Sequence, residues 1–197
     1  MTAITLSIKH NWPDVERALT RLEKDIGDKA VVRALNATIK QGETAMARQI
    51  SQTYRISQSV VKQRLSITRA RRSGGRLEMQ VTLEATRKGK GRSMNMIAFV
   101  TAPARRLKSG KRNQTKLQVR RDGGRKQITG AFIGNRERTL FIRTGKDRLP
   151  IAAVNTIDVV QMFNARKIND AVRAVLLNRF QANFSRELRV VLGGYAQ

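Results

Sequence analysis

The sequence predicts an α+β fold, in which N-terminal helices and a long C-terminal helix pack on a small antiparallel sheet with basic loops. Three observations favour this class. Apolar residues recur every three or four positions near both ends, they alternate with polar residues in the middle, and positive charge concentrates in the same middle part. A chain of 197 residues can form one hydrophobic core but not two large domains. We therefore predict a single domain over residues 1–197.

The first sixty residues predict a strand followed by two helices. Residues 2–9 alternate in polarity, as a strand with one buried face does. An apolar stripe over residues 12–26 predicts a helix that ends at Gly27. Asp28 is a suitable N-cap for a second, longer helix, whose stripe runs through residues 31–50. This part of the sequence supplies helical surface for the core.

The next segment predicts a short helix and then strands. Ser57 is expected to be the N-cap of a basic helix that includes Leu65, and the helical period fails at residues 71–75. Residues 77–85 alternate strictly and predict a strand. A second strand is expected over residues 96–100.

Residues 104–127 hold ten basic side chains and one acidic side chain. Weak alternation at Leu117 and Val119, with a turn signal at residues 122–124, is consistent with a hairpin arm. A partly disordered loop is equally consistent, and either would hold little core. The basic residues that we expect to contact a polyanion or a partner are Arg105, Arg106, Lys108, Lys111, Arg112, Arg120, Arg121, Arg125 and Lys126.

Two short apolar segments follow, at residues 130–133 and 139–143, and residues 149–151 close this region. The C-terminal part is then helical, because apolar residues from Val172 to Leu188 recur every four positions. Gly193 and its neighbouring glycine are expected to end this helix.

The net charge predicts an anionic partner. The chain carries a formal charge of +26, of which residues 61–150 contribute 20 through 25 basic and 5 acidic side chains. Nucleic acid, an acidic protein surface and an anionic membrane are all compatible with such a charge. Because residues 104–127 contain no aromatic side chain for base stacking, any DNA contact should be to the backbone, independent of sequence and sensitive to salt.

The sequence offers little for catalysis or metal binding. It has no cysteine, and its one histidine, His10, has no carboxylate at a catalytic spacing. Neighbouring carboxylates such as Asp14 and Glu16 fall on predicted helix surfaces, and no phosphate-binding glycine motif occurs. We therefore predict no enzyme, no cofactor and no metal site. With no leader pattern and no run of eighteen apolar residues, we expect a soluble protein made in a bacterial cytoplasm.

The order of these features resembles the tailed-phage minor tail protein Z family, also called tail completion proteins. The resemblance rests on the alanine-rich helix over residues 30–51, the basic segment over residues 54–70, GAFI at residues 130–133 and FIRTGKDRLPI at residues 141–151. The residues of the last motif that look most like the family are Arg143, Gly145, Lys146, Arg148, Pro150 and Ile151.

The resemblance implies a structural virion protein that completes the head-proximal end of the tail and enables head-tail joining. It also implies a homo-oligomeric ring, with a hexamer as the expectation from tail symmetry. The implied partners are the tail terminator, tail tube and tape-measure proteins. The charge leaves open whether the basic residues contact the DNA backbone or an acidic protein surface, and we expect no membrane contact. A sequence-independent nucleic-acid-binding protein is the alternative.

Overall fold

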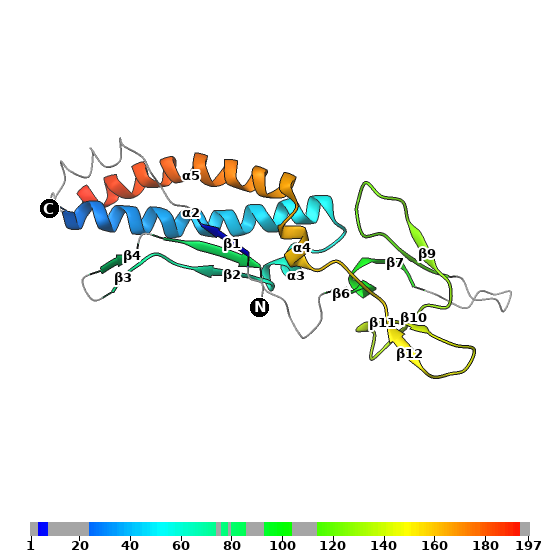
Figure 1. Ribbon diagram of the computed structural model, residues 1–197. Helices are drawn as coiled ribbons and strands as arrows, with labels where there is room; N and C mark the ends of the chain where they lie inside the picture. The colour runs from blue at the N-terminus through cyan, green and yellow to red at the C-terminus, as the bar shows by residue number, and fades with distance from the viewer. Residues whose placement is uncertain are drawn as a thin grey trace.

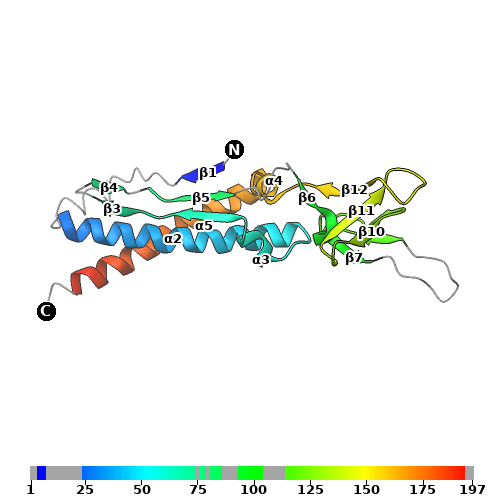
Figure 2. The same cartoon turned by 90° about the horizontal axis from the view of Figure 1, so that it is seen from below.

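The computed structural model describes residues 4–7, 24–73, 76–78, 80–85, 93–103 and 114–193. The molecule is elongated (Figures 1 and 2). At one end two long helices lie side by side over a small sheet, and at the other end several short strands form a separate lobe. We refer to these two parts as the helical body and, for residues 93–103 and 114–157, the β lobe.

Helix α2 (Lys24–Thr53) forms one side of the helical body and is continuous through Gly27 and Asp28. The predicted helix end at Gly27 and N-cap at Asp28 are therefore wrong. Gly27 is buried and followed by the buried Ala30, Val31 and Ala34, so the apolar face does not stop at the glycine. A helical glycine costs only about 1 kcal/mol, which tertiary packing readily offsets. Most of the helix predicted over residues 12–26 lies outside the described residues, and its last three positions belong to α2.

Helix α5 (Arg166–Gly193) packs along α2. The predicted stripe is confirmed, since Val172, Leu176, Phe180 and Phe184 are all buried. A Cβ at Gly42 of α2 would lie 2.5 Å from Leu176 Cδ2, so the glycine is what lets the two helices approach here.

Three antiparallel strands cover the other side of α2, in the order β1 (Ile4–Ser7), β5 (Thr82–Ala85) and β2 (Leu65–Thr68). The predicted strand at residues 77–85 is instead divided between β4 (Arg76–Glu78) and β5. Val81 and Thr82 are both buried, and two successive buried residues break the alternation that one continuous strand requires. Strand β4 pairs with β3 (Arg71–Ser73).

Helix α3 (Gln58–Lys62) begins as predicted, because the Ser57 hydroxyl accepts a hydrogen bond from Val60 N at 3.4 Å. It ends sooner than predicted. Leu65 lies in β2 instead. Leu65 and Ile67 are the less exposed residues of that strand, so burial there repeats every two residues, as in a strand, and not every three or four, as in a helix.

The β lobe contains two three-stranded antiparallel sheets. One consists of β7 (Val100–Ala102), β8 (Thr115–Leu117) and β9 (Lys126–Ile128). The other consists of β10 (Phe132–Gly134), β11 (Thr139–Arg143) and β12 (Ile151–Ala153). A further antiparallel pair is formed by β6 (Met94–Asn95) and β13 (Asn155–Thr156). It joins the segment that enters the β lobe to the segment that leaves it.

The strand predicted at residues 96–100 is wrong, because Met96–Phe99 forms the 3₁₀ helix η1. Asn95 determines this turn. Its side-chain oxygen accepts hydrogen bonds from Ile97 N at 3.0 Å and from Leu140 N at 2.9 Å, while its amide donates to Leu140 O at 3.1 Å. One side chain therefore caps the helix and fixes it to β11.

Each part of the molecule has its own apolar core. The core of the β lobe centres on Leu117, Ala131 and Leu140. Among the described residues 114–127, only Leu117, which is 2% exposed, and the fully buried Thr115 are buried, which agrees with the prediction that this stretch holds little core. Val119 packs against the cores of both parts, so it marks their junction.

A short helix that the sequence analysis did not predict, α4 (Val159–Phe163), leads from the β lobe back to α5. Asp158 and Gln161 form a capping box at its start. Asp158 is 1% exposed and lies 3.4 Å from the Arg64 guanidinium, beside β2. This ion pair ties the start of α4 to the sheet of the helical body.

Candidate interaction surface

The loop between β8 and β9 is fixed to the C-terminal end of α2. Arg55 N donates to Val119 O at 2.8 Å, Arg121 N donates to Thr53 O at 2.9 Å, and Tyr54 and Arg120 form an isolated antiparallel bridge. The described part of the predicted arm is therefore a β-hairpin that is docked on the helical body rather than projecting from it.

Two of the predicted contact residues are already engaged within the chain. Arg121 Nε donates to Ser51 O at 2.7 Å, so its cation lies at the carbonyl end of α2, where a positive charge is favourable. Arg120 forms two hydrogen bonds of 2.9 Å to the carboxylate of Asp122 and lies over the Tyr54 ring, 5.9 Å from its centroid. Both arginines therefore help to hold the β8–β9 loop against the end of α2.

The Arg120 and Asp122 side chains shift each other's ionisation. The hydrogen bond from Arg120 lowers the pKa of Asp122 below its usual 3.8, and the charge of Arg120 acts in the same direction. The same hydrogen bond raises the pKa of Arg120. Both side chains are exposed to solvent, so this pair orients the loop more than it stabilises the fold.

Arg125 and Lys126 complete the described part of the predicted set, and both are exposed. The other predicted residues, Arg105, Arg106, Lys108, Lys111 and Arg112, lie outside the described residues. The four described basic residues of the predicted set therefore have two different roles. Arg120 and Arg121 hold the hairpin in place, whereas Arg125 and Lys126 are available to contact a partner.

The family-like turn is a closed loop between β11 and β12, at the end of the molecule opposite the start of α2 (Figures 1 and 2). Thr144 closes it by donating from N and Oγ1 to Pro150 O at 3.2 and 3.1 Å. Arg143 lies over the Phe132 ring at 4.9 Å, which anchors the base of the loop.

The tip of this loop is exposed. Gly145, Lys146 and Arg148 are exposed, the Leu149–Pro150 peptide bond is cis, and Leu149 is 66% exposed. Ile151, which follows, is 39% exposed. The turn therefore presents two cations beside an apolar side chain at the far end of the β lobe.

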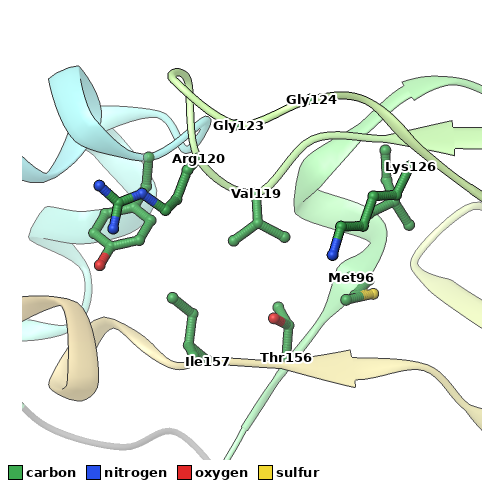
Figure 3. Close-up of a pocket in the computed structure, with 10 residues that line it drawn as sticks. Met96, Val119, Arg120, Gly123, Gly124, Lys126, Thr156 and Ile157 are labelled. Atoms are coloured by element: carbon green, nitrogen blue, oxygen red, sulfur yellow. The ribbon is translucent and has the colours of Figure 1, made fainter.

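A cavity of about 500 Å³ lies at the junction of the two parts (Figure 3). Its walls are mainly apolar, with Met96, Leu117, Val119 and Ile157 as the principal side chains. Arg120, Lys126 and Thr156 add polar groups, and Gly123 and Gly124 leave part of the rim without side chains. The charge of Lys126 is evident in the sequence, but the cavity could not be predicted from it, because its walls come from four separated segments.

Among the residues that the structure describes, no group of three or more histidine, cysteine, aspartate or glutamate side chains could hold a metal ion. His10, Asp14 and Glu16 lie outside that part of the chain. The best-defined polar contacts of the described residues instead join one element to another, as Asp158, Asn95 and Arg121 do.

An elongated, basic α+β protein in which side chains such as Asp158, Asn95 and Arg121 join separate elements fits a structural component of an assembly. The comparison with family models identifies which assembly. A model described as prophage minor tail protein Z (GPZ) matches residues 14–194. This match covers nearly the whole chain, so the chain belongs to that family and is a structural protein of the phage tail. Neither the curated proteins nor the solved structures gave a match.

The family places the protein in the virion. None of the helices in the described residues is long and apolar enough to cross a membrane.

Proposed function

We propose that this protein forms a homo-oligomeric ring, expected to be a hexamer, that completes the head-proximal end of the tail and enables head-tail joining. The observation that carries the proposal is the separation of roles along the molecule. The helical body is held by a large apolar core, whereas the β lobe carries ten basic and three acidic side chains over residues 114–157.

The free cations of the β lobe support a contact with an acidic neighbour. Within the described part of the chain, Arg136, Arg138, Lys146 and Arg148 are exposed and form no ion pair or hydrogen bond through their charged groups. A basic surface of this kind can meet acidic subunits of the tail tube, the tail terminator or the tape-measure protein.

The test is electron microscopy of particles from a phage whose copy of this gene carries an early stop codon. Complete tails of normal length that fail to join filled heads would support the proposal. Whole, infectious particles would refute it. Light scattering of the purified protein would give the number of subunits in the ring.

Complementation of this phage then tests the β lobe. One variant replaces Arg136, Arg138, Lys146 and Arg148 with glutamine, and its control replaces the exposed Lys167, Arg173, Arg179 and Arg189 of α5. Both lose four charges, so net charge is matched. We expect the lobe variant alone to lose head-tail joining, and equal losses would exclude the lobe as the specific surface.

The same exposed cations favour backbone binding to DNA as a second candidate function. Each lost phosphate contact lowers the slope of log K against log salt by about 1. The lobe variant should therefore bind a random duplex with a shallower salt dependence than the α5 variant. Identical slopes for the two variants would argue against DNA binding by the β lobe.

A further inference from the structure

The cavity at the junction combines apolar walls with one available cation. Figure 3 shows Lys126 directed from β9 toward the space between Val119, Met96 and Thr156. Within the part of the chain that the structure describes, the Lys126 ammonium has no hydrogen-bonding or ionic partner. Arg120, the other cation of the lining, is already neutralised by Asp122.

An available ammonium beside apolar walls favours a ligand that is itself part apolar and part anionic. A carboxylate that reaches Lys126 can pair with its ammonium while a neighbouring apolar side chain contacts the walls of the cavity. At about 500 Å³ the cavity is large enough for one or two side chains. The bare rim at Gly123 and Gly124 leaves room for the backbone of an entering segment, since a Cβ at Gly124 would meet nothing within 4 Å.

We propose that this cavity binds an acidic peptide segment of a partner protein. An apolar side chain of the segment enters between Met96, Val119 and Ile157, and a neighbouring carboxylate pairs with Lys126. A nucleic acid fits less well. The one aromatic ring of the lining, Tyr54, already has Arg120 over its face, and a single available cation does not match a row of phosphates.

The methyl group of Met96 provides a direct reporter. In protein labelled with ¹³C at the methionine methyls, we would titrate a blocked tetrapeptide of sequence DLFE and, separately, its uncharged isostere NLFQ. The expected result is a saturable shift of the Met96 signal by DLFE, with NLFQ binding about tenfold more weakly because it lacks the carboxylates.

The variant Lys126→Gln should weaken binding of DLFE about tenfold as well. Its matched control is Lys116→Gln, which removes one exposed charge from the same hairpin but outside the cavity lining and should leave the affinity unchanged. Because Lys126 is exposed and unpartnered among the described residues, its variant should fold normally, as circular dichroism can confirm.

Three results would overturn the proposal. They are no shift of Met96, equal binding of DLFE and NLFQ, and equal weakening by the Lys126 and Lys116 variants. A shift of Met96 by a single-stranded oligonucleotide, lost in Lys126→Gln but kept in Lys116→Gln, would identify nucleic acid as the occupant instead. The test uses the purified chain and does not depend on head-tail joining, so its failure would leave the proposed function standing.

Discussion

Asp158 acts on two elements at once, because its carboxylate caps α4 and pairs with Arg64 of the helical body. In sequence it was only one of fourteen acidic residues. The spacing of Asp158 and Gln161 before an apolar run is a capping-box pattern that could have predicted α4, but no local pattern could have predicted Arg64, which lies 94 positions away.

We expect Asp158→Ala to lower the free energy of unfolding by about 2–4 kcal/mol, since it removes a helix cap and one partner of a buried ion pair. Asp158→Asn should lose less, because an asparagine still caps. Urea unfolding measures both. The control, Asp170→Ala, removes an exposed carboxylate 3.9 Å from Arg166 and should cost no more than about 0.5 kcal/mol. Equal losses of unfolding free energy for Asp158→Ala and Asp170→Ala would show that the buried Asp158–Arg64 pair stabilises the fold no more than an exposed pair does.

The pKa of Asp122 can be measured directly by carboxyl NMR titration, and we expect it below the usual 3.8. Because the pKa is depressed in the folded protein, the pair contributes stability above the unfolded pKa and loses it as the pH falls through the folded pKa. Arg120→Gln should return the Asp122 pKa toward its usual value. Arg125→Gln, a change at an exposed neighbour in the same loop, should move the Asp122 pKa much less, and a similar effect of both would show that general charge rather than the hydrogen bond is responsible.

At the scale of elements, periodicity predicted well where one face of an element is buried. The stripe of α5 and the N-cap of α3 were confirmed. Leu83 and Ala85 are buried as expected, although the alternation fails at Val81 and Thr82. Predictions failed where contacts between distant elements determine the backbone. Asn95 turns residues expected to be extended into η1, and the burial of Gly27 keeps α2 continuous. Both effects depend on contacts across the fold.

The close approach of α2 and α5 gives a prediction about their packing. Gly42→Ala improves helix propensity by about 1 kcal/mol but places a Cβ against Leu176, and overpacking of a core costs about 1–3 kcal/mol. We expect a net loss of stability. Leu176→Ala alone should lower the free energy of unfolding by about 2–5 kcal/mol. In the double variant with Gly42→Ala the loss should be clearly smaller, because the alanine methyl at position 42 occupies part of the space that Leu176 leaves. Strictly additive unfolding energies in the double variant would contradict this account.

At the scale of the whole molecule, the sequence predicted the α+β class and the family but not the division into two cores. The division depends on pairings between distant segments, such as Asn155 with Asn95, which local periodicity does not reveal. The same limit applies to the interaction surface. Charge alone grouped Arg120 and Arg121 with Lys126, and only their tertiary contacts distinguish residues that hold the junction from one that faces a cavity.

The unequal cores predict unequal local stability. In the β lobe, Leu117, Ala131 and Leu140 form a small cluster of their own, and Met94 and Phe99 are buried in the large cluster instead. That large cluster contains the buried faces of α2 and α5. Regions with few buried contacts open at lower free energy. Hydrogen exchange by mass spectrometry should therefore show earlier exchange of the amides in β10 and β11 than of those in the middle of α2. Simultaneous exchange of both would indicate that the molecule opens only as one cooperative unit.

The docked loop between β8 and β9 also determines how the molecule responds to mechanical force. The chain itself crosses between the two parts, but pulling the β lobe away from the helical body must also break the hydrogen bonds that residues 119 and 121 make to residues 51–55. These hydrogen bonds join one loop to one helix end and lie close together. We therefore expect them to bear an applied force together and not to break one after another. Consequently, the junction should resist pulling until several of these bonds break together, although the core of the lobe is small.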